Sequence, residues 1–279
     1  SPVSAVADYV HISTLGNAVD WGDLSQARQS SAGIGTLIKG FVAGGALASG
    51  YTDDVDETIF ATRGNYARFG DLTNDRSNLG GLNNATRGVF GGGYSPNPGS
   101  RVDIIDYITL ASGGTGSDFG NLTVAADVAN NAAASSTRGL WMGKGAPAAK
   151  TIDYITIAST GNAADFGDMV ADNGIKTGCS NSIRAVGAVG YNSNVIEYLT
   201  IASTGNATDF GDLTVARGGS AAAASPTRAI FAGGQNPGVS NIIDYITIAS
   251  TGDAADFGDR LNALKFLSGA TESHGGLSG

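Results

Sequence analysis

Pairs of aspartates three residues apart recur along the chain. They occur at Asp165 and Asp168, at Asp209 and Asp212, and at Asp256 and Asp259. Two carboxylates at this spacing could share a hard cation, although a Ca²⁺ loop usually gathers more oxygen ligands than this sequence offers. We favour a structural interpretation over a metal site, in which these aspartates lie on outer edge strands. Charge there keeps an exposed edge from pairing with other chains. We therefore predict no metal site and no cofactor, while a single cation-binding pair stays open.

A basic residue recurs just before a short apolar segment. The five residues are Lys39, Arg87, Arg138, Arg184 and Arg228. Together they could form a ring that binds an anion or an acidic sugar. They could equally be structural and pair with nearby carboxylates or carbonyl groups. We favour the structural interpretation, because a residue present in every repeat is more often part of the architecture.

The segments that follow these apolar stretches differ from repeat to repeat. They cover 46–54, 94–102, 145–151, 191–194 and 235–241. Variable loops on a rigid scaffold often carry recognition, and exposed tyrosine is a good contact residue. The candidate ligand-binding residues are Tyr51, Tyr94, Tyr191, Asn97 and Asn236. The alternative, that these loops are only spacers, carries equal weight.

Signals for catalysis are sparse. His11 and His274 fall in the first and last predicted strand pairs, and a zinc or copper site would need further ligands. No Ser-His-Asp arrangement or phosphate-binding glycine loop is present. We predict no catalytic residues and no enzymatic activity. A polysaccharide-active enzyme would instead need clustered carboxylates with perturbed pKa values, and aromatic side chains that stack on sugars.

The elements that must position these residues come from one repeated stretch. Ile152–Asp168 (IDYITIASTGNAADFGD) returns almost unchanged at 196–212 and 243–259, and more loosely at 7–23, 55–71 and 105–121. Its aromatic anchors are Trp21, Phe69, Phe119, Phe166, Phe210 and Phe257, with successive steps of 48, 50, 47, 44 and 47 residues. Tyrosines recur as further anchors at Tyr9, Tyr107, Tyr154, Tyr198 and Tyr245. A sixfold period of this size indicates a repeat architecture.

Each repeat divides into four short strands. In the copy from Val215 to Asp259, Gly219–Ser225 is a strand of small residues, Arg228–Gly234 is apolar, and Ile242–Ser250 is β-branched. Thr251–Gly252–Asp253 predicts a tight hairpin turn before the fourth strand, Ala254–Leu261. Four antiparallel strands per unit predict a β-propeller. Small-residue strands such as Ala132–Ser136 and Ala221–Ser225 suit the innermost position.

The two ends of the chain predict how the ring closes. The chain begins with a third and a fourth strand and ends, over Leu264–Gly279, with a first and a second strand. Joining them gives six blades, which removes open sheet edges. The expected fold is one all-β, six-bladed propeller domain over residues 1–279. The blade segments are 1–24 with 261–279, 25–72, 73–122, 123–169, 170–213 and 214–260.

Composition limits the partners. The formal net charge of −9 and the pI of about 4.5 argue against nucleic acid or an anionic membrane surface. The single Cys179 rules out an internal disulfide framework. No apolar run approaches the roughly 18 residues of a membrane helix, so no membrane insertion is expected. No signal peptide is evident, and Ser1 is expected to be a processed end or the start of a domain from a longer chain.

The repeat resembles the kelch motif, which has a double glycine, a tyrosine, a tryptophan and an arginine in this order. Glycine pairs lie at 44–45, 92–93 and 233–234, and the arginines are Arg28, Arg76 and Arg217. Lys144, Val189, Glu57 and Ala126 depart from the motif. Kelch-like folds include a copper radical oxidase, but Cys179 has no histidine in its repeat. The resemblance implies a kelch-like propeller without that chemistry.

The phrase DYITIASTGNATDFGDLT resembles repeats in virion structural and tail-fibre proteins of marine bacteriophages. This resemblance implies a non-catalytic module on a virion surface or in an extracellular setting. Its expected partners are other virion or appendage subunits and a host-surface glycan or protein. The alternative is a decoration or scaffold protein that contacts only other structural subunits. The two roles differ in whether one propeller face is buried against a subunit.

Overall fold

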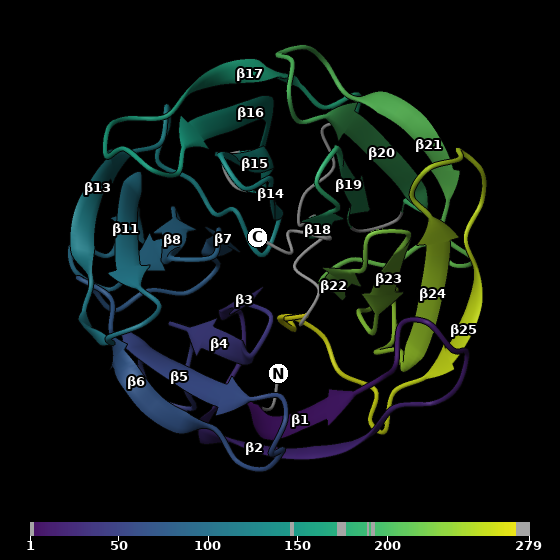
Figure 1. Cartoon of the computed structure of the whole chain (residues 1–279), viewed down its shortest axis with the longest axis horizontal. Helices are drawn as coiled ribbons and strands as arrows, with labels where there is room; N and C mark the ends of the chain where they lie inside the picture. Colours follow the sequence, from purple (N-terminus) through teal and green to yellow (C-terminus); the bar gives the residue numbers. More distant parts are fainter. Residues whose placement is uncertain (1–2, 146–147, 172–176, 189, 191–192, 272–279) are drawn as a thin grey trace.

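The fold is an all-β ring of sheets around a central axis, a β-propeller (Figure 1). The computed structural model describes residues 3–145, 148–171, 177–188, 190 and 193–271. Over this part of the chain, no helix is long and apolar enough to cross a membrane. The predicted all-β propeller is confirmed.

Five antiparallel four-stranded sheets form most of the ring, and we number them blades 1 to 5 in chain order. Blade 1 contains β3 (Ala32–Gly35), β4 (Lys39–Ala43), β5 (Asp54–Ile59) and β6 (Ala67–Asp71). Blade 2 contains β7 (Gly80–Asn83), β8 (Arg87–Gly91), β11 (Ile104–Thr109) and β13 (Ser117–Asn121). Blade 3 contains β14 (Ala132–Ala134), β15 (Arg138–Gly145), β16 (Ala148–Thr156) and β17 (Ala164–Asp168).

Blades 4 and 5 repeat this order. Blade 4 contains β18 (Thr177–Ser180), β19 (Arg184–Ala188), β20 (Val195–Thr200) and β21 (Thr208–Asp212). Blade 5 contains β22 (Ala221–Ala224), β23 (Arg228–Ala232), β24 (Ile242–Thr247) and β25 (Ala255–Asp259). Three two-residue strands are additions, namely the hairpin of β9 (Tyr94–Ser95) and β10 (Ser100–Arg101), and β12 (Gly114–Thr115) parallel to β6.

The prediction of six four-stranded blades is wrong for the described residues. The sixth position, which we call the sixth wedge, holds β1 (Ser4–Tyr9), β2 (Val19–Arg28) and residues 264–271. The tail segment makes isolated backbone bonds, from Phe266 N to Gly219 O and from Ser30 N to Phe266 O, but is not assigned as a strand. Its described contacts run to the two neighbouring blades and, through Asn130 Nδ2, which donates to Leu267 O at 2.8 Å, to the segment that leads into blade 3. Among the described residues it is assigned no ladder with β1. The second strand expected up to Gly279 lies outside the described residues.

Small residues line the axis, as predicted for the innermost strands. A channel of about 90 Å³ runs between β3, β7, β14, β18, β22 and residues 269–271. Ala132–Ala134 are buried there, and Ile34 and Leu82 are the larger side chains that also line the channel. The tail therefore occupies the inner position of the sixth wedge. Aromatic edge-to-face pairs fill the space further out, with Tyr107 against Phe119 at 6.1 Å and Tyr198 against Phe210 at 5.7 Å between ring centroids.

The predicted tight turn at 251–253 is wrong, because this segment reaches the preceding blade. Gly252 N donates to Phe210 O at 2.8 Å, and the Asp253 carboxylate accepts from Asp212 N at 3.1 Å. A β-carbon on Gly211 would lie 2.4 Å from Gly252 O, so only glycine permits this approach. Equivalent bonds from Gly16 to Phe257 and from Gly64 to Trp21 tie the sixth wedge to its neighbours and close the ring.

A buried carboxylate marks the third strand of each of the five blades, and the half-buried Asp8 is its counterpart on β1. Each is held by a cation or by backbone N–H groups. The cation pairs are Arg28–Asp56 (2.9 Å), Arg76–Asp106 (2.7 Å), Lys144–Asp153 (3.0 Å), Arg217–Asp244 (2.8 Å) and Arg260–Asp8 (2.9 Å). Glu197 accepts instead from the N–H groups of Val170 and Ala171, both at 2.8 Å.

Two departures from the kelch pattern compensate for one another in blade 3. Ala126 stands where other repeats carry an arginine, and Lys144 stands where others carry glycine. Lys144 Nζ pairs with Asp153 from the same blade and receives further support from Thr123 Oγ1 at 3.2 Å. Lys144 therefore supplies the buried cation that the alanine removed.

Cys179 is predicted to be unreactive in the folded chain. It is buried on β18, and burial raises the pKa of its thiol from 9.0 to about 12. At pH 8 we expect Ellman's reagent to react at least a hundredfold more slowly in buffer than in 6 M guanidinium chloride. Because the unfolded thiol loses its proton first, this group also lowers stability as the pH rises from about 9 towards 12. Stoichiometric labelling of the native protein within minutes would contradict this.

Candidate functional site

The loops that follow the second strands gather at one end of the ring, which we call the loop face. Glycine pairs start three of these loops. Gly44 and Gly45 have φ values of 62° and 120°, which L residues with side chains rarely adopt. Gly45 N donates to Arg76 O at 2.8 Å, so the loop is tied to the segment by which the chain leaves the same blade. Gly93 and Gly234 make the equivalent bonds to Ala126 O and Leu264 O.

Tyr51 and Tyr94 lie side by side across the boundary of blades 1 and 2. Their ring centroids are 5.6 Å apart, with the planes tilted by 43°, and both side chains are half-buried. Backbone bridges fix both residues, since Ala46 pairs with Tyr51 and Ser77 pairs with Tyr94. The result is an ordered aromatic pair on a wall of neighbouring loops. The sequence predicted that both residues lie in variable loops, but it did not predict their contact.

The other loop candidates do not join this pair. Asn97 is exposed in the β9–β10 turn of blade 2, where its carbonyl accepts a hydrogen bond from Ser95 Oγ. Asn236 is half-buried in the β23–β24 loop of blade 5, on the opposite side of the ring (Figure 1). Tyr191 lies outside the described residues.

Charged groups stand beside the aromatic pair. Arg101, at the end of β10, pairs with Asp127 at 3.1 Å. Burial raises the pKa of Asp127, and Arg101 opposes this rise. The remaining carboxylate oxygen, Asp127 Oδ1, is buried without a hydrogen-bond partner among the described residues. A polar ligand at this end of blades 2 and 3 would meet the exposed Arg101 side chain, whereas Asp127 Oδ1 is buried.

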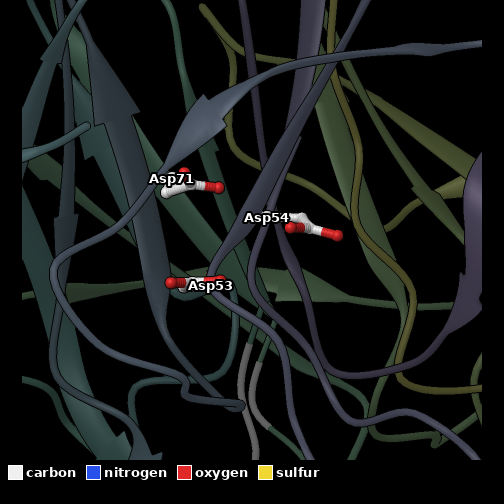
Figure 2. A group of neighbouring side chains, drawn as sticks. All are labelled: Asp53, Asp54 and Asp71. Carbon is white, nitrogen blue, oxygen red and sulfur yellow. The ribbon is translucent and has the colours of Figure 1, made fainter. Parts of the chain in front are cut away.

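Three carboxylates converge at the same end of blade 1. Figure 2 shows Asp53 and Asp54, from the start of β5, beside Asp71, from the end of β6. Their oxygens lie within 4.8 Å of one another, the only such group of three among the described residues. This group of three was not among the sites predicted from the sequence. The signal for it was adjacent aspartates at the start of one strand, opposite an aspartate that ends its partner.

Arg68 already neutralises much of this acidic group. Its guanidinium pairs with Asp54 at 2.6 Å and also with Asp71, and Gln26 Nε2 donates to Asp54. Burial raises the pKa of Asp53, with Asp75, Asp71 and Asp54 adding to the rise. Carboxylate oxygens could hold a hard cation. Arg68 pairs with two of the three carboxylates, so the group forms an ion-pair network in the structure.

The five basic residues are directed at structural partners. The guanidinium of Arg138 lies over Tyr154 at 4.9 Å and donates to Ile201 O of the next blade at 2.8 Å. Arg87, Arg184 and Arg228 follow the same pattern, the last by donating to Ile12 O in the sixth wedge. Lys39 pairs with Glu57 at 2.7 Å, which replaces the usual tyrosine. The four arginines thus join each blade to the next position of the ring, whereas the Lys39–Glu57 pair lies within blade 1.

The remaining candidates are dispersed. The aspartate pairs at 165 and 168, 209 and 212, and 256 and 259 lie exposed or half-buried along the outer strands β17, β21 and β25. His11 is exposed, with its ring edge-to-face with Tyr9 at 5.6 Å. His274 lies outside the described residues.

Comparisons with known proteins do not indicate a function for this chain. No protein-family model matches this chain, and a search of curated proteins finds no similar sequence. The fold and the loop face are therefore the basis for a functional proposal.

Proposed function

We propose that this chain is a non-catalytic binding module, a fibre or appendage domain whose loop face contacts a host-surface glycan or protein. The observation that carries the proposal is the Tyr51–Tyr94 pair, whose ring centroids lie 5.6 Å apart. Both residues are on loops that the ring of blades supports. Aromatic faces contact sugar rings and protein side chains at little entropic cost, because few rotamers are lost. The nearby Arg101 adds a charged contact.

The finer fold and the biological setting belong to the same proposal. We count the ring as six positions of kelch-like type, with the sixth wedge as a composite of the two chain ends. The likeness of the repeat to phage virion proteins supports a virion surface or extracellular location. Other appendage subunits are then the expected neighbours.

A second candidate is a scaffold protein that contacts only other structural subunits. The opposite end of blade 1 favours it, because Leu37, Ile38 and Ile59 are 53%, 65% and 45% exposed there. Exposed apolar residues gathered at one end of a blade suit a subunit contact. Particle assembly that fails with Leu37→Ser and Ile38→Ser, while glycan binding is absent in the original chain, would favour this candidate.

The test of the first candidate is a double substitution, Tyr51→Ala with Tyr94→Ala. We expect at least tenfold weaker binding to the best ligand from a printed panel of bacterial surface glycans or to whole host cells, because the aromatic contact surface is lost. Tyr51→Phe with Tyr94→Phe should bind within about threefold of the original chain, since the ring faces remain. Thr227→Ala, at the opposite end of blade 5, is the matched control. Unchanged binding by the double alanine variant would remove the loop face from the function.

A further inference from the structure

Lys144 is the only fully buried lysine in the part of the chain that the structure describes. Its Nζ atom lies 3.0 Å from Asp153 Oδ1, and the two side chains are 1% and 0% exposed. At the other positions of the ring, the cations that pair with third-strand carboxylates are all arginines. A guanidinium stays protonated, whereas a lysine amine becomes a nucleophile once it loses a proton.

Blade 3 also differs in which carboxylate oxygen meets the cation. In blades 1, 2 and 5 the guanidinium contacts Oδ2, the oxygen that also accepts from a backbone N–H group. Lys144 Nζ instead contacts Asp153 Oδ1, while Asp153 Oδ2 accepts from Thr123 N at 3.0 Å. The amine and the backbone donor therefore lie at different oxygens of the same carboxyl group.

The Thr123 hydroxyl completes a triangle with the amine and Asp153 Oδ1. Lys144 Nζ donates to Thr123 Oγ1 at 3.2 Å, and Thr123 Oγ1 donates to Asp153 Oδ1 at 2.6 Å. Protons can thus pass from the amine to Oδ1 both directly and through the hydroxyl. Burying two charges costs free energy, which the transfer of one proton to give a neutral amine and a carboxylic acid recovers.

Paired strands hold the two groups in contact. β15 and β16 run antiparallel with Trp141 opposite Asp153, and the register shifts between Met142 and Lys144. Reacting groups fixed in this way reach effective molarities of about 10⁵–10⁸ M. Condensation that is unfavourable between free molecules in water is therefore favoured at this site.

We propose that Lys144 and Asp153 condense in the folded chain to form an isopeptide bond. Nζ attacks Cγ of Asp153, so that an N–C bond forms and the bond from Cγ to Oδ1 breaks. Starting from the ammonium and the carboxylate, two protons move from Nζ to Oδ1, which leaves as water. The Thr123 hydroxyl relays one of these protons, and the Thr123 N–H stabilises the negative charge that develops on Oδ2.

The product is a neutral amide that ties β15 to β16 covalently. Both buried charges disappear, and the step balances without an oxidant or any other added reagent. The bond would close the base of the 145–151 loop in blade 3. The proposal does not depend on what the loop face binds.

The first test is the intact mass of the purified full chain. We expect a mass about 18 Da below that of the sequence, because one water is lost. Since trypsin does not cleave after an acylated lysine, residues 139–150 should remain uncut and joined to residues 151–176. Lys144→Arg is the matched control, because it keeps the buried cation but cannot be acylated in this way. This variant should show the full mass of its own sequence.

Two further variants test the route. Thr123→Val keeps the backbone donor but removes the hydroxyl, so we expect the fraction of condensed chains to grow at least tenfold more slowly. Asp153→Asn should lose about 17 Da instead of 18 Da, because ammonia replaces water as the leaving group. An unchanged rate in Thr123→Val would overturn the proposed relay.

Two results would overturn the bond itself. One is a chain that keeps the full mass of its sequence on prolonged incubation while circular dichroism shows it folded. The other is a loss of 18 Da that persists in Lys144→Arg, which would place the dehydration at another residue.

Discussion

Asp106→Ala is expected to lower the free energy of unfolding by about 3–5 kcal/mol, because it leaves a buried guanidinium without its partner. Arg76 and Asp106 both have fully buried side chains and lie 2.7 Å apart. Burial lowers the pKa of Arg76, an effect that Asp106 opposes. The same carboxylate also accepts from Thr73 N and Thr73 Oγ1, at 3.1 and 2.7 Å. Urea unfolding followed by far-ultraviolet circular dichroism measures the loss.

Two further variants separate the charge effect from simple truncation. Asp75→Ala, at an exposed position nearby, should change stability by less than about 0.5 kcal/mol. Arg76→Met with Asp106→Leu should recover most of the loss, since apolar residues of similar size can replace a buried ion pair. A loss below about 1 kcal/mol for Asp106→Ala would show that water reaches the pair.

Trp141→Ala is expected to cost about 3–5 kcal/mol through the cavity it leaves. Trp141 is fully buried on β15, at the boundary of blades 2 and 3. It fills the room that two glycines leave, since a β-carbon on Gly80 or Gly91 would lie 2.8 or 2.7 Å from the indole ring. The indole N–H also donates to Gly80 O at 3.0 Å. Unfolding should be followed by circular dichroism rather than by tryptophan fluorescence, because the substitution removes one of the two tryptophans.

The control for Trp141 keeps the ring but removes the donor. Trp141→Phe should cost less than the alanine variant, about 1–3 kcal/mol, from lost volume and an unpaired Gly80 carbonyl. Val124→Ala, at a position that is 48% exposed, should change stability by less than about 0.5 kcal/mol. An equal cost for Phe and Ala at position 141 would contradict the packing account.

Much of the architecture could be predicted from the sequence because it depends on local patterns. The period near 47 residues, the β-branched third strand and the glycine pairs each specify conformation within one repeat. The small side chains of Ala132–Ala134 predicted the inner position for a similar reason, since short side chains suit strands that crowd around a narrow axis. The tight turn predicted at Thr251–Gly252–Asp253 was wrong because the hydrogen bonds of this segment run to the preceding blade rather than across a hairpin.

The candidate sites depended on contacts between residues far apart in the chain. Tyr51 and Tyr94 were visible as loop tyrosines, but their pairing across two blades follows only from the ring geometry. Asp53, Asp54 and Asp71 meet because β5 and β6 pair in a register that sets Asp54 opposite Asp71. The Arg260–Asp8 pair joins residues from opposite ends of the chain.

By itself, the sequence determined an all-β repeat protein with an acidic surface, four strands per unit and small residues near the axis. Local side-chain preferences and periodic burial are sufficient for those features. Only the tertiary structure decided how the ring closes, which carboxylate meets which cation, and that a cavity of about 460 Å³ lies in the sixth wedge. The physical reason is that ring closure joins segments more than 200 residues apart, such as Gly16 and Phe257, whose contact no local pattern specifies.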